Sequence, residues 1–287
     1  MIYTRQEIKA ALHKNKLAPN KRLGQNFLVS SQIVEAILAR ACPDPDDTII
    51  ELGVGLGSMT IPLAAMVKNV IGIEIDAGLV RWHREHKDLP ENVTLLHEDL
   101  LQSDFRRLAM ENGGRLKIIA NLPYSISNPL LFKLLEHKDI MDYAVLMLQK
   151  EVADRLSAAA STKEYGVLSV LIGSCAAVQP LMKIGPEQFH PRPKVDSRVV
   201  RITFRPLPEQ IEQLPVYDMK LLKALVKGAF GQRRKTLLNA LAATGIKNLN
   251  KDDIRRVLAV AGLAESKRPD QLTVPEYVNL CRCYGDE

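Results

Sequence analysis

Residues 48–76 decide the fold and read TIIELGVGLGSMTIPLAAMVKNVIGIEID. An apolar run is followed by a glycine-rich turn with Gly53, Gly55 and Gly57, then by a helix-compatible segment and a second apolar run at 70–75. Strand, glycine turn, helix and strand in this order form a βαβ unit, and the glycines let backbone N–H groups come close to a ligand. The stretch therefore predicts an α/β protein with a ligand site at the turn.

Two acidic residues indicate which ligand the turn holds. Glu74, at the tip of the second strand, can accept hydrogen bonds from both hydroxyls of a ribose. Glu51 lies just before the turn, where a carboxylate would repel the pyrophosphate of a dinucleotide. S-adenosylmethionine instead carries a sulfonium and an ammonium group, so we predict this cofactor. A nicotinamide dehydrogenase is the weakest alternative, and a purely structural tight turn is another.

Size and composition set broad bounds on the class of protein. The 287 residues, 46% of them hydrophobic, suit one large domain and one small domain. A net charge of +6 favours a polyanionic partner without requiring one. The four cysteines are too few and too unevenly spaced for a disulfide framework or a zinc site, so we expect no metal and a cytoplasmic location. No apolar stretch approaches the 20 or so residues that span a bilayer, so we expect no membrane association.

Element patterns predict two domains, 1–205 and 206–287, joined by the linker RPLP at 205–208. A T-x-x-E capping box at 4–7 predicts a short N-terminal helix, which either frays or acts as a basic arm for RNA. Further strands are expected at 93–96, 116–120 and 143–148, with 168–178 and 198–204 as an antiparallel pair at the sheet edge. Beyond 208 the apolar residues follow helical spacing, which predicts an all-helical domain.

The stretch Asn121-Leu122-Pro123-Tyr124 should face the pocket at the carboxyl end of the fourth strand. The exocyclic amine of adenine is a poor nucleophile because its lone pair is delocalised into the ring. Acceptors on the Asn121 side chain and the Leu122 carbonyl can hold its two N–H groups, so that the lone pair points at a methyl group. The ring of Tyr124 can stack on the unstacked base. A proline turn that only caps the next helix is the alternative.

Other candidate ligand contacts lie in loops. Asp99 follows the third strand, where it can accept from the cofactor's adenine amine or serve as a helix cap. Gln25 and Asn26 are polar loop residues placed for a ligand contact. Cations suited to nucleic acid lie in three segments: Lys21 and Arg22; Arg192 and Lys194; and Arg233, Arg234 and Lys235, the last three expected on consecutive helix positions. A plain structural loop, for 189–197, and a solvated helix face, for 233–235, are the alternatives.

Blocks distributed over almost the whole chain resemble the ribosomal RNA adenine dimethyltransferase family. They read KRLGQNFL at 21–28, ELGVGLGSMT at 51–60, IEID at 73–76, NLPYSISNPL at 121–130, MLQKEV at 147–152, FHPRPKVDS at 189–197 and FGQRRKTLLNAL at 230–241. The last two are far more specific than a glycine turn. Val54 departs from the proline usual in the family, which should loosen the turn slightly without removing a ligand.

The resemblance implies a Rossmann-like class I methyltransferase sheet with helices on both faces and a small helical C-terminal domain. It implies that S-adenosylmethionine supplies two methyl groups to N6 of each of two adjacent adenosines near the 3′ end of small-subunit rRNA. Carried over by position, Asn26, Leu28, Gly53, Glu74, Asp99 and Asn121 would line the cofactor site. To these the residue pattern itself adds Gln25, Glu51 and Gly55. Asn121, Leu122 and Tyr124 would present the adenine, with Phe189 as a second stacking partner.

The implied partners are the small ribosomal subunit and its rRNA, and we expect a monomer. Two other functions remain open. An erythromycin-resistance type methyltransferase would modify large-subunit rRNA, but the blocks at 189–197 and 230–241 favour the small-subunit enzyme. A non-catalytic assembly or transcription factor could use the same fold, but the acids at 51, 74 and 99 together with Asn121 favour an enzyme. Methylation and a role in subunit assembly can also coexist.

Overall fold

The computed structural model describes residues 4–14, 19 and 23–285. It divides into two compact units, one formed by Met1–Ala153 and Gln179–Arg205 and the other by Asp154–Val178 and Pro206–Glu287. The segment Asp154–Val178 therefore belongs with the C-terminal unit, although the sequence analysis placed it in the 1–205 domain. The cause is packing: Tyr165 in this segment donates a 2.8 Å hydrogen bond to the Leu272 carbonyl.

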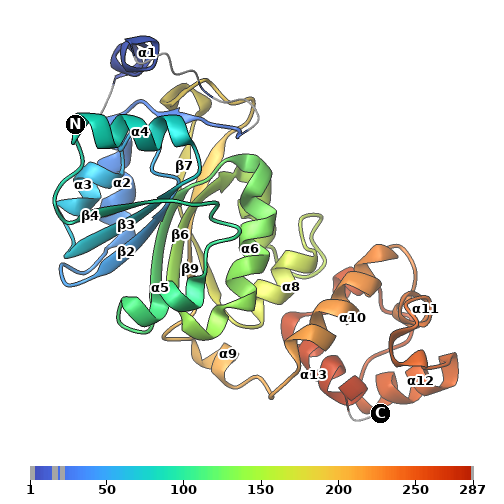
Figure 1. The fold of residues 1–287 in the computed structure, drawn as a ribbon. Coiled ribbons are helices and arrows are strands. Elements are labelled where there is room, and N and C mark those ends of the chain that lie inside the picture. Colours follow the sequence, from blue (N-terminus) through green and yellow to red (C-terminus); the bar gives the residue numbers. More distant parts are fainter. Residues whose placement is uncertain (1–3, 15–18, 20–22, 286–287) are drawn as a thin grey trace. The chain divides into compact units, whose positions relative to one another are not determined.

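A seven-stranded sheet with the order β4-β3-β2-β5-β6-β9-β7 forms the centre of the first unit (Figure 1). Neighbours from β4 to β6 are parallel, whereas β9 runs antiparallel to β6. The strand order reverses beside β2, and ligands bind at the carboxyl ends of the strands near such a reversal. The strands are β2 (Thr48–Leu52), β3 (Asn69–Glu74), β4 (Val93–His97), β5 (Leu116–Asn121), β6 (Met141–Gln149), β7 (Ala177–Ile184) and β9 (Ser197–Thr203). The predicted α/β fold is confirmed.

Helices cover both faces of this sheet (Figure 1). The longer ones begin at side chains that accept hydrogen bonds from the first-turn N–H groups: Ser30 caps α2, and Asp76 caps α4. The capping box predicted at Thr4 and Glu7 opens α1. The helices that precede or follow these strands are α1 (Arg5–Lys14), α2 (Ser31–Ala41), α3 (Thr60–Ala64), α4 (Ala77–His86), α5 (Phe105–Glu111), α6 (Ser127–Glu136) and α7 (Lys150–Leu156), with the short 3₁₀ turns η1 (Tyr124–Ile126), η2 (Lys138–Ile140) and η3 (Pro186–Gln188).

A second, two-stranded sheet brings two distant motifs together. Strand β1 (Phe27–Leu28) pairs antiparallel with β8 (Phe189–His190), so that Leu28 lies opposite Phe189. Both of these side chains are buried in the main apolar core. The QNFL segment is thereby attached to the loop that carries the FHPRPKVDS block.

The second unit is helical. It contains α8 (Val167–Gly173), α9 (Glu209–Glu212), α10 (Met219–Gly231), α11 (Leu237–Ala242), α12 (Lys251–Val260) and α13 (Val274–Gly285), with η4 (Ile246–Asn248) and η5 (Pro269–Gln271). In its core, Tyr277 stacks on Phe230 with ring centroids 6.1 Å apart. Within the part of the chain that the structure describes, no helix is long and apolar enough to span a membrane.

Two secondary-structure predictions were wrong. The segment 168–178, predicted as a strand, forms helix α8 and only the start of β7. A short continuous apolar run fits a buried helix as well as a buried strand. Here Ser174 donates to the Leu171 carbonyl one turn earlier, and Ser169 donates to the carbonyl of Arg155 in the preceding helix. The cations at 233–235 lie in the turn between α10 and α11 and not on a helix, because α10 ends at Gly231.

Candidate functional site

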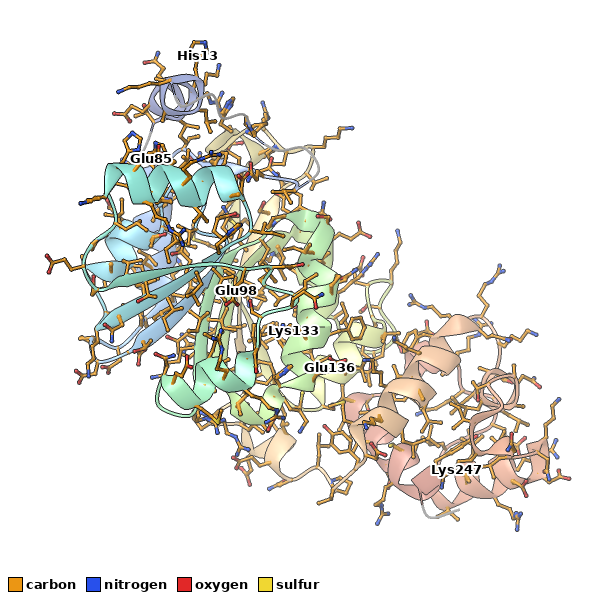
Figure 2. All side chains as sticks on the ribbon, viewed as in Figure 1. His13, Glu85, Glu98, Lys133, Glu136 and Lys247 are labelled. Carbon is orange, nitrogen blue, oxygen red and sulfur yellow. The ribbon has the colours of Figure 1, made fainter. Side chains whose placement is uncertain are left out.

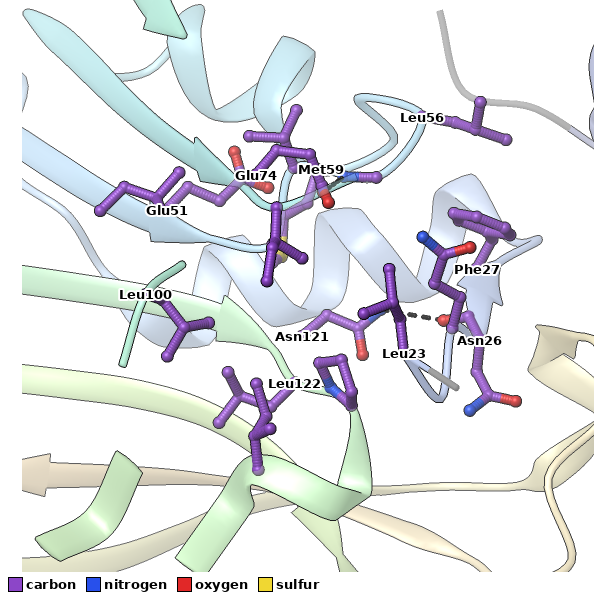
Figure 3. A pocket seen from close by; sticks show the side chains of 18 of the residues that line it. Leu23, Asn26, Phe27, Glu51, Leu56, Met59, Glu74, Leu100, Asn121 and Leu122 are labelled. Carbon is purple, nitrogen blue, oxygen red and sulfur yellow. Dashed lines mark hydrogen bonds between the residues drawn. The ribbon is translucent and has the colours of Figure 1, made fainter. Parts of the chain in front are cut away.

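A cavity opens at the carboxyl ends of the parallel strands in the first unit, and Figure 3 shows 18 of the side chains around it. Its lining includes every residue that the sequence analysis assigned to the cofactor, namely Gln25, Asn26, Leu28, Glu51, Gly53, Gly55, Glu74, Asp99 and Asn121, and also Leu122. The segments that supply them are far apart in sequence. The parallel sheet brings the residues from Glu51 to Leu122 to one edge, and the segment 25–28, which precedes and includes β1, completes the lining.

Glu74 and the glycine turn are joined by hydrogen bonds. The Gly55 N–H donates to Oε2 of Glu74 at 2.9 Å, and the Asp76 N–H donates to Oε1 at 2.8 Å. Burial raises the pKa of Glu74, and these two bonds oppose the rise because they favour the charged carboxylate. Both oxygens are therefore fixed at the end of β3, where they can also accept hydroxyl groups of a ribose.

Glu51 is the most deeply buried acid of the site, with 1% of its surface exposed. Burial raises its pKa to about 8, and the nearby Glu74 carboxylate adds to the rise. Its Oε2 has no hydrogen-bond partner within the described residues. A buried acceptor without a partner favours a cationic ligand, because ionising Glu51 beside a positive charge removes the cost of burying a lone charge. The sulfonium and ammonium groups of S-adenosylmethionine fit this requirement.

Binding of S-adenosylmethionine at pH 7 should release close to one proton from Glu51. The carboxyl is mostly protonated below its pKa of about 8 and ionises when the cation binds, so affinity should rise with pH up to about 8 and level off above it. Calorimetry in buffers of different ionisation enthalpy measures the release. Glu51→Gln, whose side chain cannot ionise, should bind S-adenosylmethionine without this proton release. Equal proton release by the two proteins would contradict the assignment.

The Asn121 side chain is oriented by a contact from the N-terminal segment. Its Nδ2 donates to the Asn26 carbonyl at 3.3 Å, the dashed line in Figure 3. Since the amide nitrogen is engaged there, Oδ1 is left as the acceptor at the cavity. The same segment is held by Gln25, whose Nε2 donates to Oδ2 of Asp76 at 2.9 Å. The QNFL segment thus sets the orientation of the Asn121 amide.

Lys133 of α6, labelled in Figure 2, stabilises the loop that carries Asp99. Its Nζ donates to the carbonyls of Leu101 and Ser103 at 2.9 and 2.6 Å, and it lies 4.4 Å from the centroid of the Phe105 ring. Burial lowers the pKa of Lys133. Asp99 itself accepts from the Leu101 N–H at 2.9 Å. The carboxylate therefore lies in a fixed loop at the cavity edge.

The two aromatic candidates have different surroundings. Tyr124 is partly buried in η1, and its hydroxyl lies 2.7 Å from Oγ of Ser197, a buried residue of the FHPRPKVDS block. Burial raises the pKa of Tyr124, so it stays a neutral phenol. Phe189 is only 1% exposed and packs in the core, and neither Tyr124 nor Phe189 is among the residues that line the cavity. This position gives no support to the prediction that Phe189 stacks on a base.

The predicted RNA-contacting cations fall into three groups. Arg192 and Lys194 are exposed in the loop after β8. Arg233 is engaged within the second unit, bonding to Oδ2 of Asp270 at 3.3 Å and to the Lys163 and Thr162 carbonyls at 2.8 Å. Its neighbours Arg234 and Lys235 are exposed. Lys21 and Arg22 lie outside the described residues.

Apart from Leu28 and Leu122, the apolar lining residues were not predicted from the sequence. Met59, Ile75, Leu100 and Ile126 contribute to the cavity wall. Each directly follows or lies close to a predicted motif, so adjacency to a motif is the signal that could have identified them. Ile75 is 44% exposed, an unusual value for an isoleucine at the end of a core strand. No group of three or more metal-ligating side chains occurs among the residues that the structure describes.

The fold and the site together define a class of enzyme. A sheet whose strand order reverses beside a glycine turn, with two buried acids lining the cavity there, is the arrangement expected of an S-adenosylmethionine-dependent methyltransferase.

Comparisons with known proteins identify the family. The family described as Ribosomal RNA adenine dimethylase matches residues 16–279. A Ribosomal RNA small subunit methyltransferase A from Desulfotalea psychrophila is 49% identical over 96% of this chain and 95% of its own length. The protein of the same name from Alkaliphilus metalliredigens is 38% identical over 98% and 97%. The chain therefore belongs to the ribosomal RNA adenine dimethylase family, and it is an rRNA adenine dimethyltransferase that uses S-adenosylmethionine.

Two solved structures support the fold. A dimethyladenosine transferase from Plasmodium falciparum has a TM-score of 0.72 at 23% identity, covering 90% of this chain and 97% of its own. The 23S rRNA methyltransferase ErmE has a TM-score of 0.65 at 21% identity, covering 90% and 98%. Both similarities concern the fold alone.

Proposed function

We propose that this enzyme converts two adjacent adenosines near the 3′ end of small-subunit rRNA to N6,N6-dimethyladenosine. The names of the curated relatives support the small subunit as the source of the substrate. The observation that carries the proposed chemistry is the bond from Asn121 Nδ2 to the Asn26 carbonyl, because it leaves an amide oxygen to receive the N–H of an adenine amine.

The chain's own groups act mainly by positioning. Oδ1 of Asn121 and the Leu122 carbonyl accept the two N–H groups of the amine, which turns the nitrogen lone pair away from them. Tyr124 supports the face of the unstacked base. S-adenosylmethionine, held by the residues that line the cavity, would supply an electrophilic methyl group to this nitrogen, with the thioether as leaving group. The nitrogen then passes a proton to water, so no strong base is required and orientation supplies most of the rate.

Transfer of labelled methyl from S-adenosylmethionine to ribosomal subunits tests the proposal. The small subunits come from a strain lacking the modification, large subunits serve as the control, and nucleoside mass spectrometry identifies the product. Dimethyladenosine on small subunits alone is expected. Product on large subunits would indicate the erythromycin-resistance type of activity. No product despite subunit binding would favour a non-catalytic assembly factor.

The exposed cations after α10 are proposed to contact rRNA phosphates. Replacing Arg234 and Lys235 by alanine should weaken binding and reduce the slope of log affinity against log salt by about 1.4–1.8, the effect of two lost phosphate contacts. Filter binding of small subunits between low and moderate salt measures this slope. Arg233 is left intact because it is paired with Asp270 inside the unit.

Lys220→Ala with Lys251→Ala is the matched control, since it also removes two exposed cations from the same unit. The control should leave the slope unchanged. If the Arg234 and Lys235 substitutions leave the slope unaltered, these residues are solvated and do not contact rRNA phosphates. Arg192 and Lys194, together with Lys21 and Arg22, are proposed to contact the rRNA near the target adenosines.

We further propose that the enzyme works as a monomer in the cytoplasm and that methylation is coupled to assembly of the small subunit. Four free cysteines, one of them the exposed Cys42, are compatible with a reducing compartment. An enzyme that stays bound to an incomplete subunit until methylation is finished would act as an assembly checkpoint. Sedimentation of the purified protein tests the monomer, and the subunit profile of a strain carrying a catalytically dead variant tests the coupling.

A further inference from the structure

His83 is a buried, titratable residue that the proposed reaction does not use. It lies on α4 with 2% of its surface exposed, and both ring nitrogens are engaged. Nε2 lies 2.9 Å from the Gly55 carbonyl oxygen, and Nδ1 lies 2.9 Å from Oδ1 of Asp88. The Gly55 contact connects this histidine to the glycine turn of the cofactor site.

The hydrogen bonds around His83 require two protons. A carbonyl oxygen can only accept, so Nε2 carries a hydrogen. A neutral imidazole would then present a lone pair at Nδ1 to the Asp88 carboxylate, and two acceptors cannot bond. The second proton therefore lies between Nδ1 and Oδ1, and a charged imidazolium paired with a carboxylate is the arrangement that satisfies both contacts. The His83 side chain is 1% exposed and that of Asp88 about one-fifth, while Oδ2 of Asp88 is buried without a hydrogen-bond partner among the described residues.

Gly55 is held from two sides. Its φ is +60°, a left-handed conformation that a glycine adopts without steric cost. The N–H of Gly55 donates to Glu74, and the C=O of Gly55 accepts from His83. The two peptide planes that flank Gly55 are thus each fixed by a side chain, one of them the predicted ribose acceptor.

A buried histidine is most often a satisfied core residue, and the surroundings of His83 are otherwise structural. Its ring lies edge-on to Trp82 at 4.6 Å, and a Cβ placed on Gly57 would lie 3.4 Å from its Cε1. Packing does not require a donor at Nε2, however. The feature that points beyond packing is the acceptor: the carbonyl of the turn residue whose N–H bonds Glu74.

We propose that His83, charged through its pairing with Asp88, is a positioning residue that holds the glycine turn in the shape that binds S-adenosylmethionine. This inference rests on the proposed function only in the identity of the cofactor. Losing the His83 bond frees the Gly55 carbonyl, so the turn must be ordered at the moment of binding and affinity falls. Binding of rRNA, which the turn does not contact in this proposal, should be unaffected.

The test measures S-adenosylhomocysteine affinity by calorimetry for His83→Leu and Asp88→Asn. Leucine fills much of the same volume without a donor, so His83→Leu should weaken binding about tenfold or more, the effect of one hydrogen bond to a charged donor. Asp88→Asn should weaken it about threefold. KM for the rRNA substrate at saturating S-adenosylmethionine should stay within twofold. His86→Leu is the matched control, because His86 hydrogen-bonds to the Trp82 carbonyl of its own helix and does not line the cavity.

Nitrogen NMR of the ring provides a second readout. Wild-type His83 should give two protonated ring-nitrogen signals at pH 7, and Asp88→Asn should lose one of them. Unchanged affinity in both variants, or a neutral ring in the wild type, would overturn the proposal. If His83→Leu does not fold, Asp88→Asn decides the question by itself. Absence of methyl transfer by a wild type that still binds S-adenosylhomocysteine would refute the proposed function and leave this inference intact.

Discussion

Replacing Asn121 by alanine is expected to reduce methyl transfer by about 10³-fold while weakening S-adenosylmethionine binding only a few-fold. In the proposed mechanism the amide oxygen is the side-chain acceptor that orients the adenine amine, and removing one oriented hydrogen-bonding group of this kind typically costs about 10²–10³ in rate. The contacts proposed between the cofactor and the acids at 51 and 74 are left in place. Single-turnover transfer to small subunits measures the rate, and calorimetry with S-adenosylhomocysteine measures the binding.

The matched control is Asn128→Ala, since this asparagine is exposed on α6 and lies outside the cavity. It should turn over at the wild-type rate. If Asn121→Ala also retained its rate, the amide would have no role in presenting the base, and the proposed mechanism would have to be abandoned. A rate lost only in parallel with cofactor affinity would assign Asn121 to cofactor binding alone.

Replacing Glu74 by glutamine should weaken S-adenosylhomocysteine binding by about 30–100-fold. The glutamine amide can still accept one backbone N–H, but its NH₂ group then faces the other, so the bonds from Gly55 and Asp76 cannot both persist. The ribose also loses a charged acceptor, and hydrogen bonds to charged groups contribute about 1.5–3 kcal/mol each. Calorimetry with the wild type and E74Q gives the ratio of their dissociation constants for S-adenosylhomocysteine.

A ligand lacking the two ribose hydroxyls sharpens this test. The 2′,3′-dideoxy analogue of S-adenosylhomocysteine should bind the wild type more weakly, and the loss caused by E74Q should be much smaller for it. Glu85→Gln, on the exposed face of α4 (Figure 2), controls for a change in net charge. An equal loss for both ligands would mean that Glu74 only supports the turn and does not contact the ribose.

Much of the site could be predicted from local patterns. A glycine turn between two apolar runs, with acids at 51 and 74, identifies the carboxyl edge of a parallel sheet, because the βαβ unit has one common geometry. The same geometry places the residues after later strands, Asp99 and Asn121, at that edge. The position of these residues at the cavity therefore followed from spacing.

Contacts between distant segments could not be predicted in this way. The bond between Asn121 and Asn26 joins residues 95 positions apart, and the pairing of β1 with β8 depends on two-residue strands that have no sequence period. The segment 168–178 was predicted wrongly because an apolar run carries no information on whether it is buried as a helix or as a strand. Packing against the C-terminal helices, which the run does not encode, decides the outcome.

The partner of the Asn121 amide is a main-chain oxygen, and this has an evolutionary consequence. No side-chain replacement at position 26 can delete a carbonyl group, so the orientation of the amide tolerates point mutation there. A deletion or insertion between residues 24 and 28 would instead bring the carbonyl of a different peptide unit to the position opposite the Asn121 amide. Drift in this enzyme is therefore constrained at the N-terminal segment by its length and path more than by the identity of residue 26.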